Sequence, residues 1–337
     1  MKVLPATLRM LLAAVLAQGA ATQPLNAATP FSPTIQETLQ AAQARGEFNG
    51  VALIAEHGEI VHAAAYGTVG AAREELLGIG HRFNIGSIAK EFSAVAVMQL
   101  RERELLSLDD PILRFLPDLP EWAGKVTVRH LLDYTSGVPD MSWRTIKSDA
   151  DAYADIRRFS ALQFPPGTQY AYTYNNVMLR QFIVEKITGT SFNDYVRQRI
   201  FKPCGMKHAL LNAPPDAPLL ARAFNGDRKE DSTDMPVTGV AYITAFDLFD
   251  WTNCLHGNRI VTRASLRLLG RSFEPKNGAL GYTVWDGERL IAHSHDGQSR
   301  NFEALMRSDL PAGRTIILLS NSKRQNLQQI ADAIEAR

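Results

Sequence analysis

The sequence predicts an α/β protein of the α+β type: an antiparallel sheet built from both chain ends and flanked by helices, with an inserted all-helical domain. Strand-like alternation occurs near the N-terminus in GVALIAEHGEIVHAAAYG (50–67) and near the C-terminus in RLIAHSH (289–295) and RTIILLS (314–320). Helical segments fill the middle. We expect a discontinuous sheet domain (28–104 and 239–337), a helical domain (105–238), and a functional cleft between them.

Individual elements follow from local signals. Ser32-Pro33 resembles a helix start. The stretch FSAVAVMQL (92–100) is apolar nearly all round, which is typical of a buried helix. Asp286-Gly287 predicts a hairpin turn. Further helices are expected in four segments: VTVRHLLDY (126–134), NNVMLRQFIVEKITG (175–189), SFNDYVRQRIF (191–201) and the chain end after Leu327.

Composition excludes several classes of protein. The chain has 337 residues, 45 % of them hydrophobic and 21 % charged, as expected of a globular protein with a sizeable core. Its formal net charge is +1, and the basic residues are scattered. We therefore expect no nucleic-acid partner and no acidic lipid surface.

The N-terminus has the layout of a secretory signal peptide. Lys2 and Arg9 precede an apolar segment and then small residues, and cleavage after Ala21 or after Ala27 fits the pattern equally well. The apolar segment is too short to span a bilayer. We assign residues 1–27 to the signal and expect a secreted, periplasmic protein without a membrane span after cleavage. The alternative is a flexible or weakly helical tail.

Cys204 and Cys254 are the two cysteines of the chain. An oxidising compartment would permit one disulfide. Two cysteines in a chain of this length are not a disulfide framework, so we favour free buried thiols. Neither has a neighbouring pattern that would activate it as a nucleophile.

A serine and a lysine three residues apart, Ser87 and Lys90, stand just before the apolar helix. Positions three apart share a helix face. A lysine held out of water loses its charge more readily and can accept a proton from the serine. One such pair is expected by chance in a chain this long, and an ordinary helix start is the plainer interpretation. The buried helix that follows argues against a freely solvated lysine.

Two other segments could carry chemistry. PPGTQYAYTYNN (165–176) contains alternating tyrosines, which are either a packed surface or proton carriers. HSHDGQS (293–299) contains two histidines that would share one strand face. A third metal ligand with supporting spacing is missing, so we expect no metal. Gly297 would instead let a substrate approach the strand.

Together these segments resemble the superfamily of serine β-lactamases and penicillin-binding proteins. The closest branch holds class C β-lactamases, D-alanyl-D-alanine carboxypeptidases, D-aminopeptidases and family VIII carboxylesterases. The resemblance runs from about residue 33 to residue 335, through five blocks in the family order. They are FNIGSIAKEFSAVAVMQL, VTVRHLLDYTSGVPD, PPGTQYAYTYNN, TGVAYITAFDL and HDGQSRNFEALMRSDLPAGRTIILLSNS.

The resemblance implies a β-lactamase-like fold and an acyl-enzyme mechanism. Ser87 would be the nucleophile, and Lys90 and Tyr172 would handle its proton. The backbone N–H groups of Ser87 and Gln298 would form the oxyanion hole. His295 and Gly297 would line the substrate edge of the sheet. No metal or organic cofactor is implied.

The chain departs from the family's Y-x-N motif. The ungapped alignment gives Tyr172-Thr173-Tyr174, with tyrosine in place of asparagine. A shift of two residues gives Tyr174-Asn175-Asn176, which matches the motif. We favour the ungapped frame and count Tyr174 and Asn176 among the expected substrate-binding residues, with His295, Gly297 and Gln298. Tyr134 and Val240 also replace residues common in the family.

We expect a serine hydrolase that cleaves an ester or amide in a small-molecule or peptidoglycan-like substrate. Loss of the asparagine would weaken β-lactam and peptide recognition more than ester cleavage. The activities considered are esterase, D-peptidase and weak β-lactamase. The alternative is a non-catalytic β-lactamase-fold binding protein that has lost the second motif.

Overall fold

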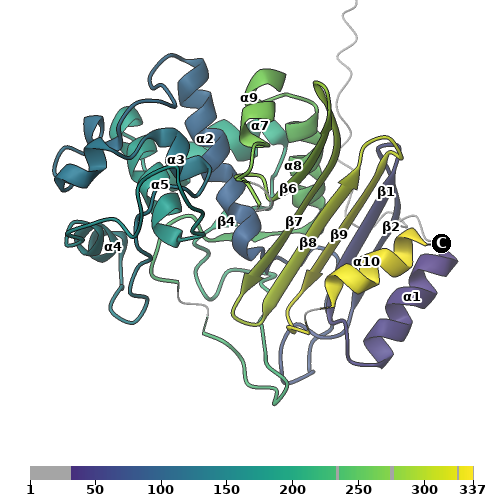
Figure 1. Cartoon of the computed structure of the whole chain (residues 1–337). Coiled ribbons are helices and arrows are strands. Elements are labelled where there is room, and N and C mark those ends of the chain that lie inside the picture. Colours follow the sequence, from purple (N-terminus) through teal and green to yellow (C-terminus); the bar gives the residue numbers. More distant parts are fainter. Residues whose placement is uncertain (1–31, 233–234, 274–276, 325, 337) are drawn as a thin grey trace, which may run out of the picture.

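The structure is a computed structural model that describes residues 32–232, 235–273, 277–324 and 326–336. The predicted signal peptide, residues 1–27, lies outside the described residues. Among the helices that are described, none is long and apolar enough to cross a membrane. Figure 1 shows a sheet with helices on both of its faces, and beside it a region made mostly of short helices and loops.

One antiparallel sheet of six strands joins the two ends of the chain. The strand order is β2-β1-β9-β8-β7-β6. Strand β1 pairs with β9, with Val51 opposite Leu319. The predicted antiparallel sheet built from both chain ends is therefore confirmed. The strands are β1 (Gly50–Glu56), β2 (Glu59–Tyr66), β6 (Tyr282–Asp286), β7 (Arg289–Ser299), β8 (Phe302–Asp309) and β9 (Arg314–Ser320).

Both faces of this sheet are covered, because side chains alternate between its two sides. On one face, Ile54 packs in a cluster with Leu39 of α1 (Pro33–Ala44) and Ile330 of α10 (Leu327–Glu335). On the other face, Leu53 belongs to a larger core that includes α2 (Lys90–Glu102) and α8 (Ala245–His256). Figure 1 shows α1 and α10 together on one side of the sheet. A fully buried leucine or isoleucine contributes roughly 1.5–3 kcal/mol.

The region between the strands is built from short helices around α5, which ends where Gly189 adopts a φ of 67°. Its core is continuous with that of the sheet. A small second sheet, in the order β3-β5-β4, adds one short strand to a region expected to be all-helical. The elements are β3 (Phe83–Asn84), η1 (Gly86–Ala89), η2 (Ile112–Arg114), η3 (Glu121–Gly124), α3 (Val128–Leu132), α4 (Asp149–Ile156), α5 (Tyr174–Thr188), α6 (Phe192–Val196), η4 (Arg197–Phe201), α7 (Lys202–Cys204), β4 (Leu210–Leu211), β5 (Ala241–Ile243) and α9 (Arg263–Leu269).

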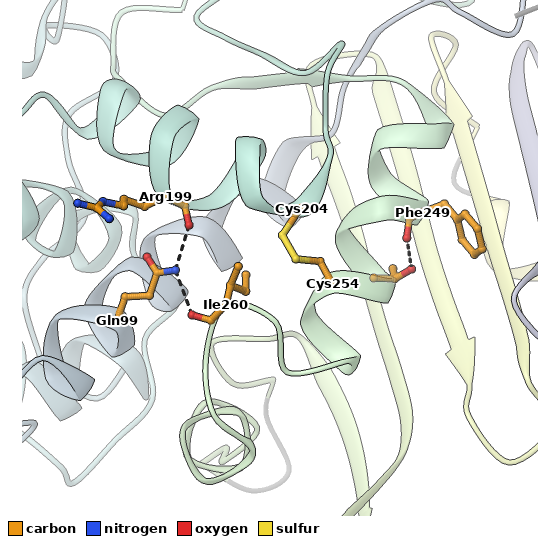
Figure 2. Close-up of a disulfide and its surroundings, with 7 residues drawn as sticks. Gln99, Arg199, Cys204, Phe249, Cys254 and Ile260 are labelled. Atoms are coloured by element: carbon orange, nitrogen blue, oxygen red, sulfur yellow. Dashed lines mark hydrogen bonds between the residues drawn. A yellow bond between two sulfur atoms is a disulfide. The ribbon is translucent and has the colours of Figure 1, made fainter. Parts of the chain in front are cut away.

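The two cysteines form a disulfide, so the prediction of free thiols is wrong. Cys204, at the end of α7, and Cys254, in α8, have Cα atoms 5.3 Å apart and are joined by an S–S bond (Figure 2). Nearby, the Gln99 amide of α2 donates to the Arg199 and Ile260 carbonyls, at 3.1 Å each. Fifty residues separate the cysteines, and only the packing of α7 on α8 brings them together.

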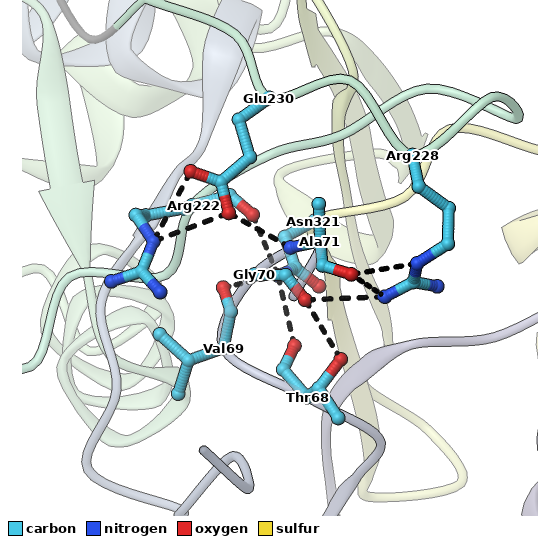
Figure 3. Close-up of polar contacts among 8 residues, drawn as sticks. All are labelled: Thr68, Val69, Gly70, Ala71, Arg222, Arg228, Glu230 and Asn321. Carbon is cyan, nitrogen blue, oxygen red and sulfur yellow. Dashed lines mark hydrogen bonds and ion pairs between the residues drawn. The ribbon is translucent and has the colours of Figure 1, made fainter. Parts of the chain in front are cut away.

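A buried asparagine just beyond the end of strand β9 binds two neighbouring segments of the chain. Asn321 follows β9, and its amide donates to the carbonyls of Thr68, Val69 and Arg222, at 3.2, 2.9 and 3.0 Å (Figure 3). Arg222 pairs with Glu230 at 3.3 Å. These contacts hold the loop after β2 and the segment around 222–230 against the sheet.

Candidate active site

Ser87 and Lys90 lie at the start of the buried helix α2, where the chain first makes a tight turn. The Asn84 carboxamide accepts a hydrogen bond from the Gly86 nitrogen at 2.9 Å. Gly86 has a φ of 53°, which favours glycine. This turn presents Ser87 in η1, one helical turn before Lys90. The Lys90 Nζ donates to the Ser87 Oγ at 2.6 Å.

The surroundings of Lys90 favour its neutral form. Burial is the largest cause, and together with the positive charge of Arg180 it lowers the pKa of Lys90 to about 8, against the opposing charges of Asp140 and Asp296. A neutral amine within hydrogen-bond distance of a serine hydroxyl can accept its proton. The Ser87–Lys90 pair is therefore arranged as a nucleophile and its base.

Two tyrosines flank Lys90, and they occupy different positions. The Lys90 Nζ lies 5.1 Å from the ring centre of Tyr172 and 5.4 Å from that of Tyr174. Tyr172 makes a side-chain hydrogen bond with Ser87, which partly offsets the rise of its pKa caused by burial and by Tyr134. Tyr174 is the first residue of α5 and lines the cleft. This placement favours the ungapped frame, in which Tyr172 is the catalytic tyrosine.

A cleft of about 520 Å³ opens beside Lys90. Its walls come from η1, α5, the loop around Trp143, the 235–240 segment and the end of β7. The Trp143 and Tyr174 rings meet edge to face with centres 5.0 Å apart. The wall opposite the sheet is therefore aromatic at the position where the family motif would place a carboxamide.

Strand β7 runs directly along the Ser87 turn. A Cβ on Gly297 would lie 1.9 Å from the Ile85 carbonyl oxygen and 3.2 Å from the Ser87 nitrogen, and a Cβ on Gly86 would lie 2.5 Å from the Gln298 nitrogen. Only glycine allows this approach. The two facing backbones bring together the nitrogens of Ser87 and Gln298, which are the expected oxyanion-hole donors.

The remaining expected site residues lie deeper in the protein. Burial lowers the pKa of His295, whose Nδ1 lies 2.7 Å from the Asp296 carbonyl oxygen. Asn176 is buried, and its side chain bonds Ser136 at 2.6 Å and Thr173 at 2.8 Å. Asn176 does not line the cleft, so its placement gives no support to a substrate contact.

The two histidines of HSHDGQS have separate partners. His293 bonds Glu91 and His256, whereas His295 bonds a backbone carbonyl. In the parts of the chain that the structure describes, no group of three His, Cys, Asp or Glu side chains could hold a metal ion.

Sequence reasoning missed three residues around the site: Trp143, Glu91 and Arg180. Trp143 lies in a loop without a motif. Glu91 and Arg180 are both 0 % exposed, although each is charged. Arg180, together with Gln181, interrupts the apolar run from Val177 to Val184, and this was the signal that could have drawn attention to it.

Known proteins share both this sequence and this fold. Residues 35–337 match the family model described as Beta-lactamase. Penicillin-binding protein 4* of Bacillus subtilis (strain 168) is 25 % identical over 324 residues, which cover 86 % of this chain and 71 % of the relative. A D-aminopeptidase of Cereibacter sphaeroides is 32 % identical over 174 residues, which cover 49 % of this chain and 33 % of the relative.

Solved structures agree on the architecture. A penicillin binding protein from Bacillus halodurans superposes with a TM-score of 0.78 at 22 % identity, over 91 % of this chain and 99 % of that one. A class C beta-lactamase superposes with a TM-score of 0.77 at 17 % identity, over 90 % and 95 %. These likenesses confirm the β-lactamase-like fold. Because the family model covers nearly the whole described chain, the protein belongs to the Beta-lactamase family of serine hydrolases.

Proposed function

We propose that the chain is a secreted, periplasmic serine hydrolase that cleaves esters through an acyl-enzyme on Ser87. The distance of 2.6 Å between the Lys90 Nζ and the Ser87 Oγ carries this proposal. It is supported by the burial that lowers the pKa of Lys90 to about 8, so that a sizeable fraction of this amine is neutral near neutral pH.

In the first half of the reaction, neutral Lys90 takes the Ser87 proton while the Oγ attacks the acyl carbon. The N–H groups of Ser87 and Gln298 stabilise the oxyanion. The bond to the leaving group then breaks, and Tyr172 passes the proton to the departing oxygen. In the second half, water attacks the acyl-enzyme by the same proton route in reverse, which releases the acid and restores Ser87.

The cleft favours esters with an apolar group. Tyr174 and Trp143 offer ring surfaces where a carboxamide would hold a substrate amide. Val177 and Val240 extend this apolar lining, and the carboxamides of Asn84, Gln181 and Gln298 line other parts of the same cleft. An ester needs fewer polar partners than a peptide or a β-lactam, because it has no N–H group to satisfy. The names of the relatives keep β-lactams and D-amino acid peptides among the substrates to be tested.

Export to an oxidising compartment is supported by two features. Residues 1–27 have the pattern of a signal peptide. The Cys204–Cys254 disulfide would form and persist outside the cytosol. Detection of the processed chain in a periplasmic fraction, and of the intact chain when Lys2 and Arg9 are replaced by acidic residues, would test this part of the proposal.

The nucleophile is tested with Ser87→Ala. Wild-type protein should hydrolyse a p-nitrophenyl ester and carry the acyl group on the peptide that contains Ser87 in mass spectrometry. Ser87→Ala should lose about 10³-fold or more in kcat/KM while its thermal unfolding is unchanged. Turnover retained in folded Ser87→Ala would refute the assignment.

The two tyrosines offer a matched pair of variants. Tyr172→Phe should lower kcat by about 10²–10⁴-fold, because it removes a proton carrier. Tyr174→Phe keeps the ring and should leave kcat on small esters within a few-fold. Equal losses in both variants would contradict the assignment of Tyr172.

A substrate panel separates the ester proposal from its rivals. Nitrocefin, a p-nitrophenyl ester and a D-alanyl-D-alanine peptide should rank with the ester first. A peptide or nitrocefin rate above the ester rate would overturn the ester preference. Folded protein labelled by neither a fluorescent penicillin nor a fluorophosphonate would instead indicate a non-catalytic binding protein.

A further inference from the structure

Arg180 is a cation in the interior of the protein that forms no ion pair with any described residue. It lies on α5 and is 0 % exposed. Its Nη2 donates to the Tyr134 hydroxyl at 3.3 Å, while its Nε and Nη1 have no hydrogen-bond partner among the described residues. None of the ion pairs between described residues includes Arg180. Burial of an unpaired charge opposes folding, so this guanidinium calls for a reason other than stability.

Tyr134, the partner of Arg180, is itself held in an unusual conformation. It is 1 % exposed and has a φ of 56°, which is rare for a bulky side chain. Its carbonyl accepts from the Ala171 nitrogen at 2.9 Å, which ties it to the tyrosine segment. Strained backbone of this kind concentrates at functional sites.

A chain of neighbouring side chains connects Arg180 to Lys90. The Arg180 Cζ lies 5.3 Å from the Tyr134 ring centre, and the Tyr134 and Tyr172 ring centres are 4.6 Å apart. The Tyr172 ring centre is in turn 5.1 Å from the Lys90 Nζ. Arg180 and Tyr134 are buried at 0 % and 1 % exposure, so the Arg180 charge is less screened by water than a surface charge would be, although Tyr172 is 43 % exposed.

We propose that Arg180, held by Tyr134, is a positioning residue whose charge keeps Lys90 in its neutral, proton-accepting form and drives the proton onward to the leaving group. The inference rests on the proposed function. Ser87 transfers its proton to Lys90, which becomes a second cation near Arg180. Repulsion between the two cations favours release of that proton through Tyr172 to the departing oxygen, after which Lys90 is neutral again. The same positive charge favours the anionic form of Tyr172.

Other groups act on Lys90 and must be held constant. Burial lowers the pKa of Lys90 most, and the charge of Arg180 is the next cause that lowers it. The charges of Asp140 and Asp296 raise it. The groups that face Lys90 are Tyr174 of α5, Tyr172 just before it, Asp140 in an earlier loop, and His295 and Asp296 of β7. Variants of Arg180 leave all of these in place.

The test is the pH profile of kcat/KM on an activated ester. We expect kcat/KM to rise with pH as Lys90 loses its proton. Wild type should show an acid limb near pH 8. Arg180→Met removes the charge at similar volume, so the pKa of Lys90 should rise and the limb should move by about one pH unit to higher pH. Arg180→Lys keeps the charge and should keep the limb within a few tenths of a unit. Arg180→Gln is a second neutral variant and carries the same prediction as Arg180→Met if that variant does not fold.

Each outcome decides the proposal. An acid limb in folded Arg180→Met or Arg180→Gln that coincides with wild type would overturn it. So would an equal shift in Arg180→Lys, because that result would make shape rather than charge responsible. Failure of the proposed function looks different: wild type would then form no acyl-enzyme on Ser87 at any pH.

Discussion

Two buried charges lie close to Lys90, and they differ in how completely they are paired. Glu91 is fully buried, with one carboxylate oxygen 3.1 Å from the His293 Nε2 and the other accepting from the Trp251 Nε1 at 2.7 Å. Arg180 is buried as deeply, but two of its nitrogens have no hydrogen-bond partner among the residues that the structure describes. The comparison suggests that the paired charge holds the fold together, whereas the unpaired charge acts on the chemistry.

The position of Glu91 explains its structural role. It follows Lys90 on α2, its partner His293 belongs to β7, and Trp251 belongs to α8. The carboxylate therefore joins the helix that carries Lys90 to the strand that carries Gln298. Burial alone would raise the pKa of Glu91, but His293 and Trp251 more than offset this and hold it below its usual range.

Breaking the paired charge should have the largest effect. Glu91→Ala leaves Trp251 without its acceptor and removes the carboxylate beside His293, whose Nε2 keeps only the Leu280 carbonyl at 3.0 Å, so we expect a loss of about 3–5 kcal/mol in the free energy of unfolding. Urea unfolding measures it. Glu91→Gln keeps the shape and one acceptor and should lose less. A loss below about 1 kcal/mol for Glu91→Ala would remove the distinction between the two charges.

Removing the disulfide should have the next largest effect on the free energy of unfolding. It anchors α8 one turn beyond Trp251 and closes a loop of about fifty residues. The double variant Cys204→Ser/Cys254→Ser should lose about 2–4 kcal/mol in urea unfolding. Because the disulfide does not touch Lys90, the pH profile of the remaining activity should stay in place. A displaced profile would mean that α8 also positions the catalytic residues.

The sequence predicted the sheet, its pairing of both chain ends and the Ser87–Lys90 pair, because each depends on local periodicity or a compact motif. It did not predict the disulfide, since the approach of Cys204 to Cys254 depends on how distant helices pack. Arg180 was missed for a related reason. An arginine followed by a glutamine in an apolar run is compatible with a solvated face, and only the fold shows that both side chains are buried.

Low pH should destabilise the region around Glu91 and His293 through His256, whose Nε2 lies 2.9 Å from the His293 Nδ1. Burial and the neighbouring His293 lower the pKa of His256 to about 3, below its usual value of about 6.5. The unfolded chain therefore binds a proton that the folded chain does not, and stability falls as the pH drops from about 6.5 toward 3, by about 1 kcal/mol per pH unit. Urea unfolding at pH 7.5, 6 and 5 measures the slope. His62, His130 and His295 also have lowered pKa values. His256→Gln should therefore reduce the slope by about this contribution without removing it, and an unchanged slope in that variant would exclude a contribution from His256.

Removing the unpaired charge should have the smallest effect on stability. Arg180→Met replaces a guanidinium that lacks an anion by an apolar side chain of similar length, so the lost hydrogen bond to Tyr134 is offset by the relief of an unfavourable buried charge. We expect its free energy of unfolding to lie within about 1 kcal/mol of wild type, or above it. Urea unfolding beside Glu91→Ala makes the contrast direct: one buried charge is needed for the fold, and the other is retained at the expense of stability. A loss of 3 kcal/mol or more in Arg180→Met would make Arg180 a structural residue like Glu91, and the two regions would then differ in pairing but not in role.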